Sequence, residues 1–365
     1  KTTNVNKGKK SKLFTEIKID TTSRFTSGFK EFDRVLGGGI VPGSIVLLGG
    51  EPGIGKSTIV LQSAGIISLN EQVLYITAEE SLEQVKIRWE RLNQKSLDLK
   101  IYAETNLSLI IKEIQKIKPS FAIIDSIQAI YSDEMESSPG SVSQVRTCSS
   151  ELQKLAKDNN IAMLIIGHVT KEGALAGPKT LEHLVDVVLN FEGDNIASHR
   201  LLRSIKNRFG STFEIGIFEM LENGLKEVCN PSSIFTNKEN ISGVTTTITN
   251  EGSRPFAVDI QALVNKTFYS NPRRTTTGIN INRLHQILAV IEKHVGIKLS
   301  DYDCYIATGG GFEINDPSSD LGVAISILSS LKNIPPLNNC SFVGELGLSG
   351  QVRQANNLRA KIEEA

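Results

Sequence analysis

The sequence has few cysteines and no long apolar run. Its four cysteines, Cys148, Cys229, Cys304 and Cys340, are far apart among 365 residues and form no C-x-x-C pair. This pattern shows no zinc site and is typical of reduced cysteines in the cytoplasm. No apolar stretch reaches the roughly 18 residues that a membrane span needs, and no signal-peptide pattern is visible. We expect a cytoplasmic protein without membrane contact.

An excess of charge of either sign is also missing. The 40 Lys and Arg residues balance 40 Asp and Glu residues, so the protein as a whole has no positive field to attract nucleic acid. A local excess of lysine does occur before residue 13. We interpret residues 1–21 as a basic, flexible arm, and a patch that binds nucleic acid is the alternative.

A phosphate-binding loop is the strongest feature that the sequence does have. Residues 50–57 read G-E-P-G-I-G-K-S and match the pattern G-x-x-x-x-G-K-[ST]. An apolar run precedes this loop and a helical pattern follows it, which is the context that the motif requires. The backbone N–H groups of such a loop and the N-terminus of its helix bind phosphate oxygens. The expected nucleotide-binding residues are Gly50, Glu51, Pro52, Gly53, Ile54, Gly55, Lys56, Ser57 and Thr58.

Three side chains are expected to act directly on the phosphates and the metal. Lys56 would neutralise the β- and γ-phosphates, and the Ser57 hydroxyl would bind Mg²⁺. Asp125 ends a strongly apolar run and is expected to support the same metal. The sequence therefore predicts a site for ATP with Mg²⁺.

Polar side chains also follow two further predicted strands, 73–77 and 162–166. Glu79 and Glu80 come just after the first strand, and His168 comes after the second. Because parallel strands end at a common crevice, these side chains should lie near the γ-phosphate. We favour Glu79 as the base that polarises the attacking water, while Glu80 is the competitor and could instead be an acid in the next helix. His168 could sense the γ-phosphate or be structural, and position alone leaves both open.

The order of the predicted elements indicates the fold class. Strands and helices alternate through most of residues 22–231, which predicts an α/β ATPase core with a mainly parallel sheet covered on both faces. After residue 186, short strands follow one another through tight turns and are expected to be antiparallel. Residues 232–240 are predicted to be a linker, and 241–365 a second domain with an α+β order.

Basic side chains near the functional edge are candidates for DNA contact. Arg146 adjoins one long loop, and Lys171 and Lys179 belong to a second loop. Aromatic residues are sparse there, so contacts to the backbone of single-stranded nucleic acid are favoured over base readout.

Two more cations, Lys206 and Arg208, lie in a turn between two predicted strands. The turn is either a solvated hairpin tip or a cationic finger that reaches the nucleotide of a neighbouring subunit.

Together these motifs resemble those of RadA/Sms, the bacterial RecA-like ATPases of DNA repair and recombination. The segment 206–210, with the sequence K-N-R-F-G, is the signature of that family, whereas the phosphate loop is shared with many ATPases. The resemblance extends over nearly the whole chain from about residue 22. The matching segments are 50–57, 79–81, 125–128, 167–173, 176–178, 206–210, 251–255 and 261–264.

The resemblance implies a hexameric ring with ATP at the subunit interfaces. It implies ATP hydrolysis that depends on DNA, movement along single-stranded or branched DNA, branch migration, and a RecA-type recombinase as partner. By position, Glu79 would be the catalytic base, and Lys206 and Arg208 would act across the interface and in coupling to DNA. Family members usually begin with a four-cysteine zinc module, so zinc is expected only if such a module was removed. The last residues, in an apparent helix, suggest a truncated C-terminus.

The region 241–365 resembles the proteolytic domain of Lon proteases, which RadA chains use as a scaffold. Ser318 aligns with the Lon nucleophile and Lys361 with its general base, although RadA chains usually have alanine at the serine position. Asp316 and Asp320 stand where Lon has glycines and would place negative charge beside a developing oxyanion.

Three functions remain in order of preference. The first is a DNA-dependent ATPase motor. The second is a RecA-like signalling ATPase that acts on proteins, against which the segment 206–210 and the Lon-like domain argue. The least favoured is a Ser-Lys peptidase.

Overall fold

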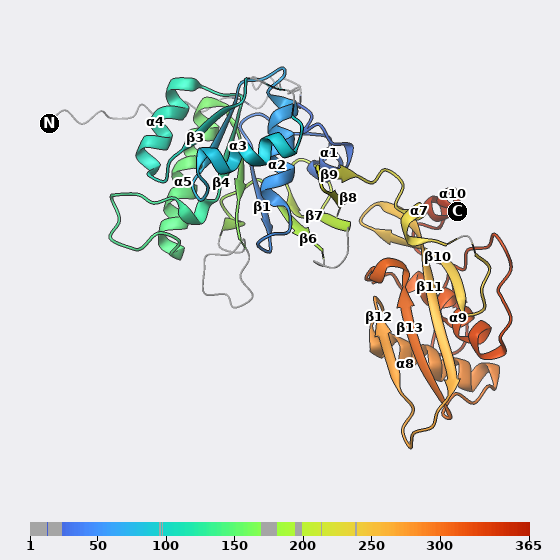
Figure 1. Cartoon of the computed structure of the whole chain (residues 1–365). Coiled ribbons are helices and arrows are strands. Elements are labelled where there is room, and N and C mark those ends of the chain that lie inside the picture. The colour runs from blue at the N-terminus through green and yellow to red at the C-terminus, as the bar shows by residue number, and fades with distance from the viewer. Residues whose placement is uncertain are drawn as a thin grey trace.

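Figure 1 shows the computed structural model, in which the chain forms two lobes. The structure describes residues 13, 24–94, 96, 98–168, 181–193, 199–212, 214–237 and 239–365. The expected arm, 1–21, lies outside the described residues except for Leu13. Among the described helices, none is long and apolar enough to cross a membrane.

The first lobe is built on a nine-stranded sheet in the order β3-β2-β4-β5-β1-β6-β7-β8-β9. The strands from β3 to β6 in this order are parallel, and β7, β8 and β9 continue the sheet as antiparallel strands. The parallel core agrees with the order read from the sequence. The expectation that all strands after residue 186 are antiparallel is wrong for β6, which pairs in parallel with β1 and is antiparallel only to β7. The strands are β1 (Ile45–Gly50), β2 (Val73–Thr77), β3 (Lys100–Ala103), β4 (Phe121–Asp125), β5 (Ala162–Ile166), β6 (Val187–Glu192), β7 (His199–Asn207), β8 (Ile215–Leu221) and β9 (Gly224–Glu227).

Helices cover both faces of this sheet, so its central strands are buried on both sides. In β1, Val46 and Leu48 join the hydrophobic core on the side of α1 and α2, whereas Ile45 and Leu47 join the core on the side of α4 and α5. This two-sided burial explains why the strand is a continuous apolar run rather than an alternating one. The helices are α1 (Lys30–Leu36), α2 (Lys56–Ile67), α3 (Leu82–Arg91), α4 (Leu107–Ile117) and α5 (Val142–Asn159).

The second lobe has a four-stranded sheet in the order β10-β11-β13-β12. Its pairs are antiparallel except β12 with β13, and α8 and α9 contribute buried side chains to the core beneath the sheet. This arrangement agrees with the α+β order expected from the sequence. Its elements are α7 (Ser232–Phe235), β10 (Val244–Glu251), β11 (Arg254–Lys266), β12 (Arg274–Thr277), α8 (Ile281–Val290), β13 (Tyr302–Thr308), α9 (Asp320–Lys332), β14 (Glu345–Leu346), β15 (Val352–Arg353) and α10 (Leu358–Glu364).

The segment expected to be a linker, 232–240, is partly helical. It begins with α7, and Phe235 in that helix is buried against Phe256 and Phe312 of the second lobe. The composition of the segment, rich in turn-forming residues, predicted a linker but did not indicate that Phe235 packs against the aromatic residues of the second lobe.

Candidate nucleotide-binding site

The loop between β1 and α2 has the conformation that phosphate binding requires. Gly50 and Gly55 have φ angles of 149° and 114°, in the region that favours glycine. A Cβ on Gly50 would come within 2.5 Å of the Phe191 oxygen, and one on Gly55 within 2.7 Å of a methyl carbon of Met220. The strands β6 and β8 therefore support the loop from behind. Among the described residues, no side chain caps the N-terminus of α2, so its N–H groups are available to phosphate oxygens.

Lys56 is buried at the start of α2 and is held by the loop itself. Its Nζ donates hydrogen bonds to the carbonyl oxygens of Gly50, at 2.8 Å, and Glu51, at 2.9 Å. Burial lowers the pKa of Lys56 to about 8, although the nearby charges of Asp125 and Glu79 oppose this shift. The ammonium group of Lys56 is thus close enough to Asp125 and Glu79 for their charges to act on it.

Asp125 ends β4 beside the phosphate loop. Tyr75, a buried residue of the adjacent strand β2, donates a hydrogen bond to Asp125 Oδ2 at 2.5 Å. Burial raises the pKa of Asp125, and hydrogen bonds from Tyr75 and Ser57 oppose the rise. A serine hydroxyl beside a carboxylate is a hard oxygen pair that suits Mg²⁺, which commonly combines one or two such ligands with substrate phosphates and water. Among the described residues, no group of three or more His, Cys, Asp or Glu side chains is placed to hold a metal ion.

The two adjacent carboxylates after β2 have different surroundings. Glu79 accepts a hydrogen bond from Ser126 and lies 3.3 Å from His168 Nε2 through its Oε1. The hydrogen bond from His168 is the largest effect on the pKa of Glu79, which is lowered despite partial burial. Glu80 instead pairs with Arg88 at 2.5 Å and so is tied to α3. Glu79 therefore lies with Ser126 and His168 and close enough to Lys56 for their charges to interact, whereas Glu80 does not share these contacts.

The register of the sheet assigns Lys206 and Arg208 to the opposite edge from the phosphate loop. Lys206 lies opposite Val188, near the start of β6, whereas Gly50 lies opposite Phe191 near its end. Three residues along a strand span about 10 Å, and the turn that follows Lys206 continues away from the loop. Lys206 and Arg208 thus lie toward the opposite ends of the strands from the phosphate loop.

Both cations have partners at this far edge. Lys206 Nζ donates to the carbonyl oxygens of Glu182 and Val185, at 2.5 and 2.9 Å. Arg208 is half exposed and pairs with the buried carboxylate of Asp186 at 3.1 Å. The simple reading of a solvated hairpin tip is therefore wrong for Lys206, whose ammonium group is fixed.

The candidates for DNA contact are only partly described. Arg146 is exposed on the first turns of α5, but Lys171 and Lys179 lie outside the described residues. Gln144 is buried and bonds the carbonyl oxygens of Ser132 and Ser137, so it holds the loop before α5 in shape. That loop also carries three carboxylates, at residues 133, 134 and 136. These charges do not favour contact with DNA phosphates.

One supporting residue, Arg200, was not indicated by any motif. It is buried at the start of β7, and its Nε donates to the carbonyl oxygen of Ile54 in the phosphate loop at 3.3 Å. An arginine in a strand far from the loop in sequence has no local signature, so only the folded arrangement reveals it.

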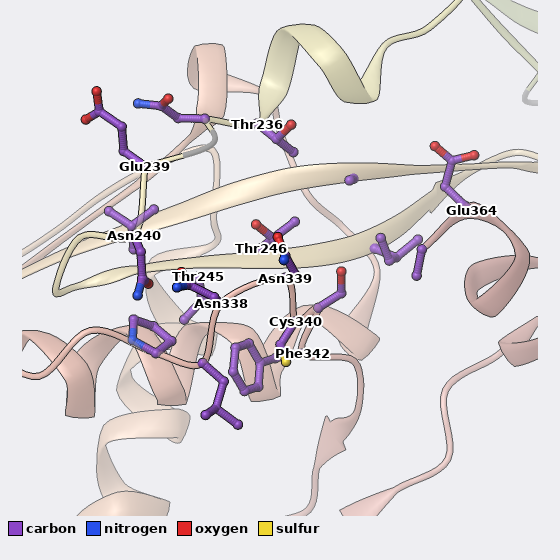
Figure 2. Close-up of a pocket in the computed structure, with 18 residues that line it drawn as sticks. Thr236, Glu239, Asn240, Thr245, Thr246, Asn338, Asn339, Cys340, Phe342 and Glu364 are labelled. Atoms are coloured by element: carbon purple, nitrogen blue, oxygen red, sulfur yellow. The ribbon is translucent and has the colours of Figure 1, made fainter.

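A separate cavity of about 490 Å³ lies in the second lobe, beside β10. Figure 2 shows polar and acidic side chains around it, among them Asn240, Asn339, Glu239 and Glu364. Among the described residues that line it, none is lysine or arginine. A triphosphate therefore fits the loop after β1 far better than this cavity.

The second lobe brings Ser318 and Lys361 into contact. Lys361 Nζ donates hydrogen bonds to Ser318 Oγ and to the carbonyl oxygen of Ile248, the latter at 3.0 Å, and it also pairs with Asp316. Ser318 and Lys361 are 2% and 1% exposed. Although burial opposes it, the hydrogen bond from Lys361 lowers the pKa of Asp316, which stabilises the ion pair.

Comparisons with known proteins identify the family of the chain. A family model described as the KaiC ATPase matches residues 25–113, which include the phosphate loop. DNA repair protein RadA of Synechocystis is 49% identical over 372 residues, covering 96% of this chain and 74% of that protein. The Listeria monocytogenes protein of the same name is 49% identical over 98% of this chain and 79% of its own length. The chain belongs to the RadA family.

The solved structures that match this RadA-family chain are less similar to it in sequence than the RadA relatives are. A KaiC-like protein of Pyrococcus horikoshii has a TM-score of 0.47 at 21% identity and covers 57% of this chain and 99% of its own. A RadB recombinase has a TM-score of 0.44 at 21% identity over 56% of this chain and 99% of its own. Together with the family model and the mainly parallel sheet, the RadA relatives identify the first lobe as a RecA-like ATPase domain.

The contrast between Glu79 and Glu80 leads to a first prediction. We expect Glu79→Gln to lower the rate of ATP hydrolysis by about 10²- to 10⁴-fold, because a neutral amide cannot polarise water. Binding of a fluorescent ATP analogue should remain. Glu80→Gln is the matched control and should keep most of the rate, since Glu80 pairs with Arg88. Equal losses in both variants would contradict the assignment.

The environment of Lys56 leads to a second prediction. A neutral lysine no longer attracts phosphate, so the affinity for ATP should fall as the pH rises through about 8, the pKa to which burial lowers this group. The fall should approach tenfold per pH unit above that value. Titration with a fluorescent ATP analogue from about pH 7 to about pH 9 measures it, within a range where arginine stays charged. Lys56→Arg should flatten the profile, and an equally steep profile in that variant would refute the role of Lys56.

Proposed function

We propose that this RadA-family protein is a DNA-dependent ATPase of DNA repair and recombination. It works as a hexameric motor on single-stranded DNA, promotes branch migration, and acts in the cytoplasm together with a RecA-type recombinase. The names of the relatives support a role in DNA repair, and the RecA-like domain supports ATP hydrolysis. The hexamer, the DNA dependence and branch migration follow from the resemblance and are the parts to be tested.

The observation that carries the proposal is the separation of charged groups between two edges of one sheet. Lys56, Asp125 and Glu79 gather at the edge with the phosphate loop, whereas Lys206 and Arg208 lie at the other edge. In a ring, the far edge of one subunit can face the phosphate loop of the next. A cation supplied in this way stabilises the charge of the transition state and accelerates phosphoryl transfer by about 10³- to 10⁵-fold.

Within this proposal each side chain has a distinct task. The N–H groups of the loop and Lys56 bind the phosphates, and Ser57 and Asp125 would hold Mg²⁺, which would supply positive charge to the phosphate oxygens. Tyr75 fixes the orientation of Asp125 through its hydrogen bond. Glu79 accepts a hydrogen bond from the attacking water, and His168 holds Glu79 in place.

A peptidase activity is the second candidate, because Ser318 and Lys361 are in contact. Two observations oppose it. Both side chains are almost fully buried, and Lys361 Nζ is already bound by Asp316 and by the carbonyl oxygen of Ile248. We therefore propose that the second lobe is a Lon-like scaffold in which this cluster fastens α10 to β10.

A third prediction tests the motor. We expect single-stranded DNA to stimulate ATP turnover, and Lys56→Ala to abolish turnover with or without DNA. Lys206→Ala should keep ATP binding but lose most of the stimulated rate, because its cation acts on the site of the next subunit. Lys226→Ala, which changes an exposed lysine of β9, is the control and should turn over normally. Absence of stimulation at modest salt would refute the motor, and loss of ATP binding in Lys206→Ala would refute the cross-subunit role.

A fourth prediction concerns the second lobe. Any degradation of casein by the purified protein should be the same in Ser318→Ala, because the serine is enclosed and its lysine is paired. Loss of a casein-degrading signal in that variant alone would establish a peptidase and would contradict the scaffold.

A further inference from the structure

The turn between β10 and β11 brings two charged side chains of the second lobe into the ATPase domain. Glu251 and Arg254 face each other at the end of this hairpin, and both are largely buried. Arg254 pairs with Glu31 of α1 at 2.6 Å, and Glu251 pairs with Arg203 of β7 at 2.6 Å. One hairpin thus contacts two separate elements of the other lobe.

The pair formed by Arg254 and Glu31 is built into a buried network. Glu31 is 2% exposed, and the oxygen that contacts Arg254 also accepts a hydrogen bond from the backbone N–H of Ile217 at 3.1 Å. Arg254 donates a further hydrogen bond to the carbonyl oxygen of Cys229 at 2.8 Å. A buried ion pair with such additional bonds fixes geometry, since loss of either charge leaves the other uncompensated.

The other end of α1 contacts the turn that contains the signature segment. Asn207 donates a hydrogen bond to the carbonyl oxygen of Val35 at 3.2 Å. Gly37, just past the helix, lies against Gly210 so closely that a Cβ on Gly210 would come within 2.8 Å of the Gly37 Cα. Because Glu31 and Val35 are four residues apart in α1, about 6 Å of helix separates the contact with Arg254 from the contact with Asn207.

The second contact of the hairpin reaches the same turn along β7. Arg203, which pairs with Glu251, precedes Lys206 by three residues in that strand. The hairpin is therefore connected to the segment 206–210 in two ways: through α1 and along β7.

We propose that the hairpin turn of the second lobe holds the segment 206–210 in position, with Glu251 and Arg254 as positioning residues for the cross-subunit site. This inference rests on the proposed role of Lys206. It gives the second lobe a task in ATP turnover that does not require the lobe to touch nucleotide.

The test uses Glu251→Gln, which should fold because Arg203 keeps a second partner, Glu192, at 3.4 Å. We expect the turnover number for ATP to fall about tenfold, as small displacements of a catalytic group have effects of this size, with the KM for ATP unchanged. Hydrogen exchange in the segment 207–212 should become faster. Asp301→Asn, which removes an exposed ion pair with Lys298 in the same lobe, should change none of these quantities.

Arg254→Met combined with Glu31→Gln tests the second route without leaving an unpaired buried charge. It should give the same fall in turnover at unchanged KM. In the background of Lys206→Ala, neither set of changes should lower the turnover number further by more than about twofold, because positioning residues act only through the group they position.

The outcomes separate the two proposals. If Lys206→Ala turns over normally, the cross-subunit role fails, and the positioning role fails with it. If Lys206→Ala is impaired but the hairpin variants are not, only the positioning role is overturned. It is also overturned if the losses multiply in the combined variants, or if exchange in 207–212 is unchanged.

Discussion

The parallel hydrogen-bonding ladder of β1, β2, β4 and β5 is the constraint on which the nucleotide site depends. Because these strands run in one direction, the residues that follow them meet at one edge, although they are separated by more than a hundred residues in the sequence. The ladder also requires apolar strands with helices on both faces. The same apolar runs that bury the sheet therefore determine where the phosphate loop, Glu79, Asp125 and His168 are brought together.

Most of this arrangement could be predicted from the sequence because it depends on local signals. The phosphate loop has a fixed spacing, the central strands are continuous apolar runs, and Asp125 and Glu79 directly follow such runs. The sequence also favoured Glu79 over Glu80, which stays a prediction, and the contacts that distinguish the two carboxylates are not local. They are made by Arg88 to one carboxylate and by Ser126 and His168 to the other.

The features that sequence reasoning missed are contacts between distant segments. Tyr75 reads as an ordinary strand residue until β4 brings Asp125 beside it, and Arg200 has no motif at all. The strand β3 begins and ends with exposed residues, so it lacked the apolar run that revealed its neighbours. Likewise, composition suggested a linker at 232–240, but Phe235 fills an aromatic cluster that only the tertiary structure creates. Such contacts depend on chain geometry rather than on residue type.

The contact between Gly37 and Gly210 has a mechanical consequence. Side chains usually absorb small displacements between packed elements by changing rotamer. Here two backbones meet without a side chain between them, so no such adjustment is available. A shift of the end of α1 must move the adjoining turn or break the contact. The end of α1 and the turn therefore move together. Replacing Gly210 by alanine would place a methyl group against the Gly37 backbone and push the two elements apart.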